Sequence, residues 1–236
     1  MIEGQVVDGL FLLSFARAID LDIAGQKRGS VLDFSSPLTG GGKIYDMSGK
    51  GNHGSISGPT WARLPSGLWV LDFDGVDDQV TAPIAIESSI ESFTLKAWVY
   101  ATLAPVDWER SFFRDNGYSL HLNNTNGVWA FGVWNDPAAQ ICYGTSALVY
   151  SKWVHVVGVY DKGANYSYIY VNGVQENSLA ISAGALYAST GTKIGYGVDV
   201  NRWFKGRLAL IRFYNIVLND RTIVSHFNQE RHLFGV

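Results

Sequence analysis

The chain has 236 residues, of which 47% are hydrophobic, 14% aromatic and 17% charged, and its formal net charge is −3. This length and apolar content suit one large β-sandwich or two small domains, while the slight negative charge gives no basic field to attract nucleic acid or an anionic membrane. No segment approaches the roughly 20 apolar residues of a membrane-spanning helix, so we expect neither nucleic acid nor a membrane span.

The amino-terminal segment, residues 1–28, is predicted to form an apolar arm. Its first residues are acidic and Arg17 interrupts its apolar run, so it does not have the pattern of a secretory signal. Within Val6–Ile19 the spacing permits a short amphipathic helix, while Leu10–Phe15 alone would pass for a strand. A cluster this apolar must be buried. We favour burial on a neighbouring subunit, which predicts a homo-oligomer, over burial on the arm's own domain.

The stretch from Trp153 to Gly173 predicts the centre of an antiparallel β-sandwich. Trp153–Tyr160 and Tyr166–Val171 are rich in the β-branched and aromatic residues that favour strands. A polar loop joins them, and Asn172-Gly173 then supplies a second tight turn. The first strand is apolar on both faces, as expected for the middle of a sandwich.

Other segments complete the predicted sheets and add one helix. The remaining strands are expected at Ser30–Phe34, Ser111–Phe113, Tyr118–Leu122, Val128–Trp134, Ile141–Tyr143, Thr192–Ile194 and Arg207–Tyr214. Asn219 is a candidate helix N-cap, and Ile223, Val224 and Phe227 give the apolar stripe of a short helix that ends near Glu230. Two residues are assigned to the interior: Cys142, the only cysteine, as an inert thiol, and His155 as a hydrogen-bonded core residue.

A series of motifs resembles a known family. In order they are YDMSGKGNHG (Tyr45–Gly54), Trp61, LDFDGVDDQV (Leu71–Val80), FTLKAWVY (Phe93–Tyr100), WVHVVGVYD, YIYVNG, IGYG (Ile194–Gly197) and FKGRLALIRFYNIVLND (Phe204–Asp220). Together they resemble the laminin-G-like, concanavalin A-like jelly-roll family, which includes pentraxin-type lectins. The resemblance covers residues 29–236. It implies an all-β, two-sheet antiparallel jelly-roll β-sandwich with one short carboxy-terminal helix.

Calcium is the cofactor that the oxygen-rich loops would take, at one of two sites. The first combines the YDMSGKGNHG loop with GVDD, through Asp46, Asn52 and Asp77 with Asp78. The second is implied by the resemblance to pentraxins, whose pattern matches Asp115, Asn116 and Asp199 here. Turns need the same residue types. The sequence also departs from many relatives, because Ala209 and Leu210 replace two acids in the last long strand.

Candidate ligand-binding residues lie at strand ends and in loops, where the binding sites of sandwiches gather. Aromatic rings there would stack on sugar faces, and nearby cations would serve anionic glycans or a protein partner. The candidates are Trp108, Trp134, Tyr196, Trp203, Arg114 and Arg202, with Arg110 nearby. In contrast, Trp98, Trp129 and Trp153 follow strand patterns and are assigned to the core.

The sequence favours a binding function over catalysis. A glycoside hydrolase needs carboxylates that face one sugar ring, and the closest candidates are the pairs Asp20/Asp22 and Glu87/Glu91. The first pair lacks a third carboxylate, and the second has the surroundings of a solvated loop. We therefore expect a non-enzymatic, lectin-type module that recognises a glycan or a surface protein outside the cell or on a particle surface. The alternative is a structural or decoration protein of an assembly such as a virus particle, and an enzyme ranks last.

Overall fold

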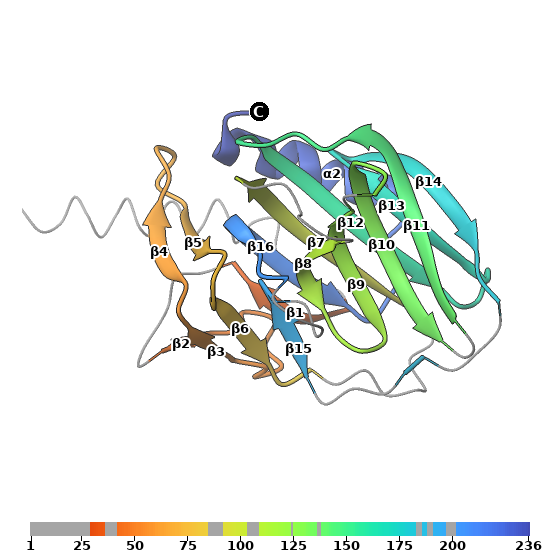
Figure 1. Cartoon of the computed structure of the whole chain (residues 1–236), viewed down its shortest axis with the longest axis horizontal. Coiled ribbons are helices and arrows are strands. Elements are labelled where there is room, and N and C mark those ends of the chain that lie inside the picture. Colours follow the sequence, from red (N-terminus) through yellow and green to blue (C-terminus); the bar gives the residue numbers. More distant parts are fainter. Residues whose placement is uncertain are drawn as a thin grey trace, which may run out of the picture.

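Two antiparallel β-sheets face each other and a helix lies near the carboxyl terminus, as the computed structural model shows (Figure 1). The structure describes residues 29–35, 42–84, 92–102, 109–123, 125–135, 138–182, 186–187, 191–196 and 202–236. The predicted all-β, two-sheet sandwich with one short carboxy-terminal helix is confirmed. The predicted apolar arm, residues 1–28, lies outside the described residues.

Sheet A, the first of the two, has the strand order β14-β13-β12-β7-β16-β5-β4, with β1 also pairing with β16. Its strands are β1 (Ser30–Phe34), β4 (Thr60–Arg63), β5 (Trp69–Asp74), β7 (Ser92–Ala101), β12 (Trp153–Asp161), β13 (Tyr166–Val171), β14 (Val174–Ala180) and β16 (Lys205–Tyr214).

Sheet B has the strand order β11-β10-β9-β8-β15-β6-β3-β2. Its strands are β2 (Lys43–Ile44), β3 (Gly54–Ser57), β6 (Gln79–Ala82), β8 (Glu109–Arg114), β9 (Tyr118–Asn123), β10 (Val128–Asn135), β11 (Ala138–Ala147) and β15 (Thr192–Ile194).

The predicted central hairpin is confirmed. Strand β12 pairs with β7 on one side and β13 on the other, and Trp153–Tyr160 is buried throughout. Between β13 and β14 the chain turns in two residues, Asn172 with φ 50° and Gly173 with φ 81°. Two successive positive φ angles match a type I′ turn, whose twist suits a hairpin.

Strand β14 was not predicted, because its sequence VQENSLA is polar and its side chains are largely exposed. Its side chains instead tie the edge of sheet A to the edge of sheet B. Glu176 accepts hydrogen bonds from the backbone N–H groups of Thr145 (2.8 Å) and Ser146 (3.1 Å) in β11. Asn177 donates to the carbonyl of Tyr143 (2.9 Å). On this side the sandwich is therefore closed by side chains.

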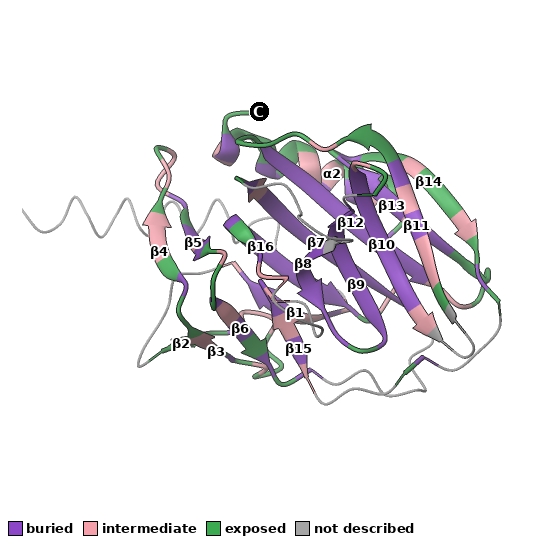
Figure 2. Ribbon diagram, in the orientation of Figure 1, coloured by how far each residue is buried: buried purple, intermediate pink, exposed green. Residues whose placement is uncertain are grey.

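Aromatic rings fill the space between the sheets. Phe93 of β7 stacks on Phe213 of β16, with ring centroids 5.5 Å apart, and also meets Tyr118 and Phe131 of sheet B at 5.3 and 6.0 Å. The central strands are buried along most of their length, whereas β14 is largely exposed (Figure 2). Cys142 is buried as predicted, and burial raises the pKa of its thiol to about 11, so the thiolate is not available at neutral pH.

A helix covers the outer face of sheet A, the face opposite the core. Helix α2 (Asp220–Glu230) begins at the predicted N-cap, where the Asn219 side chain accepts from the N–H of Thr222 at 2.9 Å, and it continues into the 3₁₀ turn η1 (Arg231–Phe234). Ile223 is buried and Phe227 half-buried as the predicted stripe requires, but Val224 is exposed. The last turn packs over Trp98 of β7, whose ring lies 4.1 Å from that of Phe234.

A buried charge network fixes the helix to the sheet. The carboxylate of Glu230 accepts from Lys96 Nζ (2.8 Å), from Trp98 Nε1 (2.7 Å) and from Arg212, which also pairs with Asp33 at 3.0 Å. Burial opposes the ionised form of Glu230, but the charges of Lys96 and Arg212 outweigh it and hold its pKa well below the usual range. The network is electrically balanced, since two cations meet two carboxylates.

His155 is fully buried beside this network, as predicted, but the predicted hydrogen bond of its side chain is wrong. Neither ring nitrogen has a hydrogen-bond partner within the described part of the chain. The ring packs instead against Trp98, at a centroid distance of 5.2 Å. Aromatic packing therefore replaces the expected polar contact.

Removing the charge of Glu230 should destabilise the fold severely. Glu230→Gln leaves Lys96 and Arg212 in the interior with only Asp33 to balance them, and breaking a buried pair in this way costs about 3–5 kcal/mol. Asp72→Asn is the matched control, because the Arg207–Asp72 pair is exposed (side chains 40% and 36%) and such pairs contribute about 0–1 kcal/mol. Urea unfolding of the two variants measures both values, and equal losses would show that the network contributes little.

Candidate functional site

The candidate site lies on the outer face of sheet B. In β8, β10 and β15 the side chains of Phe113, Val133 and Ile194 belong to the core between the sheets. Successive side chains of a strand point to opposite faces. The residues next to these core positions therefore project from the outer face: Arg114, Trp134 and Lys193.

The strand register brings these side chains together. Lys193 of β15 is the direct pairing partner of Arg114 in β8, so their side chains leave adjacent strands on the same face. The Arg114 guanidinium lies 5.0 Å from the centre of the Trp134 ring. Gly132 makes room for that ring, because a Cβ atom at this position would come within 2.5 Å of it. The position of Trp134 thus depends on a glycine in the strand beneath it.

Two further rings extend the arrangement past β15. The ammonium of Lys193 lies 4.6 Å from the centre of the Tyr196 ring, and the Tyr196 and Trp203 rings are 4.3 Å apart at 41°. Arg110 donates a hydrogen bond to the carbonyl of Trp203 and so fixes the backbone there. We call the set Trp134, Arg114, Lys193, Tyr196 and Trp203 the cation–aromatic strip.

The strip combines apolar rings with positive charge at a partly accessible surface. Its members are partly exposed except Arg114, which is 7% exposed. The Lys193 ammonium contacts the Tyr196 ring and has no carboxylate partner among the residues that the structure describes. Rings of this kind stack on the C–H faces of sugars, and two adjacent cations attract an anionic group.

A buried polar network lies beside the strip on the same face. The hydroxyls of Ser111 and Ser119 are 2.9 Å apart, and that of Ser119 lies 3.1 Å from His121 Nδ1. All three side chains are fully buried. Because Ser119 pairs directly with Arg114 and with Gly132, this network sets the surface on which the arginine and the Trp134 ring rest.

Four predicted ligand residues, Arg114, Trp134, Tyr196 and Trp203, come together in the strip. Arg202 precedes Trp203 and is half-buried, while Trp108 lies outside the described residues. Trp98, Trp129 and Trp153 are core residues as predicted. Sequence reasoning missed Lys193, as well as the network of Ser111, Ser119 and His121. The alternation of polar residues in YSLHLN was the signal available for that network.

The residues of the first predicted calcium site fall into two groups in the structure, and Asp46 and Asn52 form the first. The two carboxylate oxygens of Asp46 accept from the backbone N–H groups of Asp33, Ser48 and Asn52 and from the Ser48 hydroxyl, at 2.7–2.9 Å. The Asn52 side-chain amide donates to the carbonyl of Val31 at 2.7 Å. Asp46 therefore organises a turn.

Asp77 lies in a separate acidic group. Carboxylate oxygens of Asp74, Asp77 and Asp78 lie within 4.8 Å of one another, and among the described residues this is the one group of three metal-ligating side chains. Burial and the neighbouring charges of Asp74 and Asp77 raise the pKa of Asp78.

In the second predicted site, Asp115 is buried in the β8–β9 turn, where its Oδ1 accepts from the N–H of Gly117 at 3.4 Å. Asn116 beside it is exposed, and Asp199 lies outside the described residues. Ala209 and Leu210, where the sequence was expected to depart from the family pattern, are buried with Trp98 and Phe234. Apolar contact with the terminal helix region thus occupies that position.

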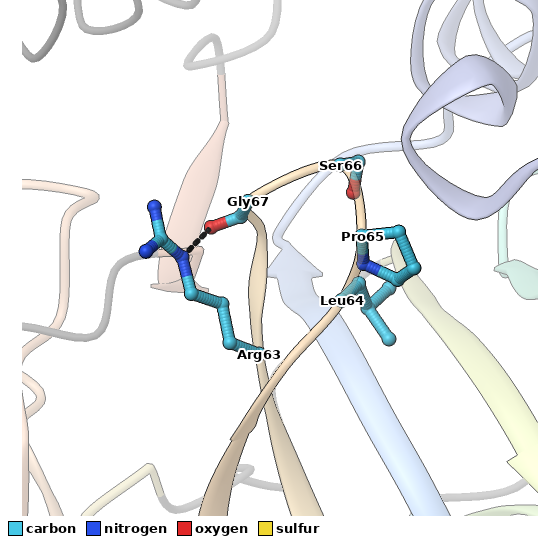
Figure 3. A pocket seen from close by; sticks show the side chains of 5 residues that line it. All are labelled: Arg63, Leu64, Pro65, Ser66 and Gly67. Carbon is cyan, nitrogen blue, oxygen red and sulfur yellow. Dashed lines mark hydrogen bonds between the residues drawn. The ribbon is translucent and has the colours of Figure 1, made fainter.

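A shallow hollow of about 580 Å³ lies at the β4–β5 turn and is lined by Arg63, Leu64, Pro65, Ser66 and Gly67 (Figure 3). Arg63 Nε donates to the Gly67 carbonyl at 3.2 Å, and the Ser66 hydroxyl donates to the carbonyl of Leu233 at 2.6 Å. The first bond closes the turn, and the second holds it against the carboxy-terminal region. The lining has no carboxylate or histidine, so it offers no acid–base chemistry. The carboxylate pairs Asp20/Asp22 and Glu87/Glu91 lie outside the described residues.

Calcium binding stays a prediction, and thermal melting tests it. A cation that binds only the native state raises its stability, by about 2.7 kcal/mol at a hundred times its dissociation constant. We expect melting to shift upward in millimolar Ca²⁺ and to return with chelator. Asp77→Asn should abolish the shift if the ion binds at the acidic group, and Asp115→Asn if it binds at the β8–β9 turn. An unchanged melting temperature in Ca²⁺ would exclude both.

Comparison with known proteins identifies the family. The model of the concanavalin A-like lectin/glucanases superfamily matches residues 74–224. No curated protein matches the chain. In the described part of the chain, no helix has the length and apolar character needed to cross a membrane.

Similar folds occur among solved binding domains of toxins. The binding domain of Paraclostridial Mosquitocidal Protein 1 has a TM-score of 0.69 at 14% identity, over 86% of this chain and 52% of that one. The receptor-binding domain of Botulinum Neurotoxin type G gives 0.69 at 13%, over 85% and 51%. The binding domain of Botulinum Neurotoxin DC, in complex with SialylT, gives 0.65 at 15%, over 86% and 52%. The chain thus spans about half the length of these domains.

The predicted family is therefore confirmed by the match of the family model, and the architecture of the sandwich agrees with the fold of that family. Since the family model covers more than half of the 236 residues, this chain belongs to the concanavalin A-like lectin/glucanase superfamily.

Proposed function

We propose that the chain is a non-enzymatic recognition module that binds an acidic glycan, free or on a surface protein, through the cation–aromatic strip. The observation that carries the proposal is the pairing of Arg114 with Lys193 on adjacent strands, each cation against an aromatic ring. One domain of similar fold, the binding domain of Botulinum Neurotoxin DC, supports a partner of this kind, since it is found in complex with SialylT and in complex with rat synaptotagmin II. A glycan ligand implies an extracellular or particle-surface setting.

The chemistry of the strip fits this ligand class. A sugar has an apolar C–H face that covers a ring, and a carboxylate or sulfate on it accepts hydrogen bonds from Lys193 and Arg114. Arginine and lysine differ in their roles here. The planar guanidinium of Arg114 is held by the Trp134 ring, while the ammonium of Lys193 is a point charge on a flexible stem. We therefore expect Trp134 and Arg114 to form the rigid part of the site.

Substitutions in the strip should weaken binding without unfolding the chain. A hydrogen bond to a charged group contributes about 1.5–3 kcal/mol, so Lys193→Ala should lower affinity by about tenfold to 150-fold, and Trp134→Ala should also lower it. The matched controls are Lys152→Ala and Trp69→Ala, both at exposed positions away from the strip. An array of acidic and neutral glycans finds the ligand, and titration calorimetry with that glycan measures the loss. Equal losses in the controls, or a preference for neutral glycans, would contradict the proposal.

The second part of the proposal concerns self-association. We propose that residues 1–28 join copies of this chain into an oligomer. The support is the apolar composition of Val6–Ile19. About 25 cal/mol is gained for each Å² of apolar surface buried, which amounts to several kcal/mol for such a cluster.

Deleting residues 1–28 should then convert an oligomer into a smaller folded species by light scattering. A full-length chain that is monomeric at high concentration, or a truncated chain that fails to fold, would instead place the segment on its own domain.

A further inference from the structure

Two histidines lie at the contact between the terminal helix region and sheet A. His155 of β12 is fully buried, and His226 of α2 is 3% exposed. The His155 ring lies 5.2 Å from the Trp98 ring and 6.0 Å from that of Phe227, so it is enclosed between strand and helix. The His226 ring stacks on Tyr214 of β16 at 6.2 Å. Both imidazoles are therefore shielded from water only while the helix is in place.

Three of the four ring nitrogens of these histidines are buried without a hydrogen-bond partner within the described part of the chain. They are both ring nitrogens of His155 and Nδ1 of His226. Burial, followed by the charge of Lys96, lowers the pKa of His155 to about 3 and that of His226 to about 2. Both side chains are thus neutral in the native state at neutral and mildly acidic pH.

Three buried charges act on both histidines: Lys96 of β7, Arg212 of β16 and Glu230 of α2. They already pair with one another, and Arg212 also pairs with Asp33 of β1. The pKa of Lys96 is lowered to about 8 by burial, so it stays positive in acid. A proton on either histidine would add a third buried cation to a network that holds two carboxylates.

We propose that α2 and η1 form an acid-released cover over sheet A, held at neutral pH and freed when His155 and His226 take up protons. Release would expose the apolar outer face of sheet A that carries Trp98 and Trp153, now packed under Phe234. This device is separate from the cation–aromatic strip, which lies on the other sheet, and does not depend on its function.

The lowered pKa values of the two histidines determine how the stability of the cover changes with pH. Above pH 6.5, the ordinary value for histidine, neither state takes up the protons, so the cover keeps its full stability. As the pH falls from 6.5 toward 3, the released state binds two protons that the covered state does not. Each histidine then shifts the equilibrium toward release by about tenfold per pH unit. Below 4.5, protonation of Glu230 acts in the same direction.

Native-state hydrogen exchange of the full chain tests the proposal between pH 5 and 6. The logarithm of the opening constant of the α2 amides, corrected for intrinsic exchange, should change with pH with a slope near two. His155→Phe and His226→Phe each keep a ring and lose no hydrogen bond that the structure records at these nitrogens. Each variant should reduce the slope by about one, and both together should bring it near zero. His232→Gln, on the exposed side of η1, is the control and should leave the slope unchanged.

Two results would overturn the proposal. One is a slope near zero in the wild-type chain, which needs no variant to fold. The other is loss of protection in the β12 amides at the same pH and by the same factor as in α2, since this would show unfolding of the whole sandwich and not release of a cover.

Discussion

The burial of alternate side chains of sheet B between the two sheets determines where the cations and rings of its outer face lie. Phe113, Val133 and Ile194 are buried in the core between the sheets, so the side chains next to them in each strand must lie on the outer face. A slip of one residue in β8, β10 or β15 would bury Arg114, Trp134 or Lys193, respectively, between the sheets. The same burial that stabilises the sandwich therefore also aligns the cations and rings of the strip.

The two outer faces of the sandwich accommodate their polar side chains in different ways. Sheet A carries Lys96, Arg212 and Trp98 on its outer face, and these need the carboxylate of Glu230 and the rings of the terminal segment to be buried without a large penalty. On the outer face of sheet B, Ser111, Ser119 and His121 Nδ1 are linked by hydrogen bonds within the sheet. One face is thus completed by a helix, while the other presents charged and aromatic groups at its surface.

The sequence predicted most reliably those elements whose local chemistry and tertiary role agree. The hairpin Trp153–Gly173 combines β-branched residues with an Asn-Gly turn. The start of helix α2 depends on a local hydrogen bond, from the N–H of Thr222 to the side chain of Asn219. Strand β14 was missed because its partner strand, not its polar composition, determines its conformation. Lys193 was missed because a single lysine in TKI has no signal before the register places it beside Arg114. Asp46 was ambiguous because turn formation and calcium ligation use the same residues.

The bridge from β14 to β11 has a consequence for the behaviour of the protein at high concentration. Free strand edges are templates on which further chains add by backbone pairing, and this is a common start of fibrous aggregates. Glu176 accepts hydrogen bonds from two backbone N–H groups of β11, and its negative charge therefore lies between the edges of the two sheets. The addition of strands from other copies of the chain is therefore hindered on this side of the sandwich. At high concentration we expect copies to contact one another here through side chains.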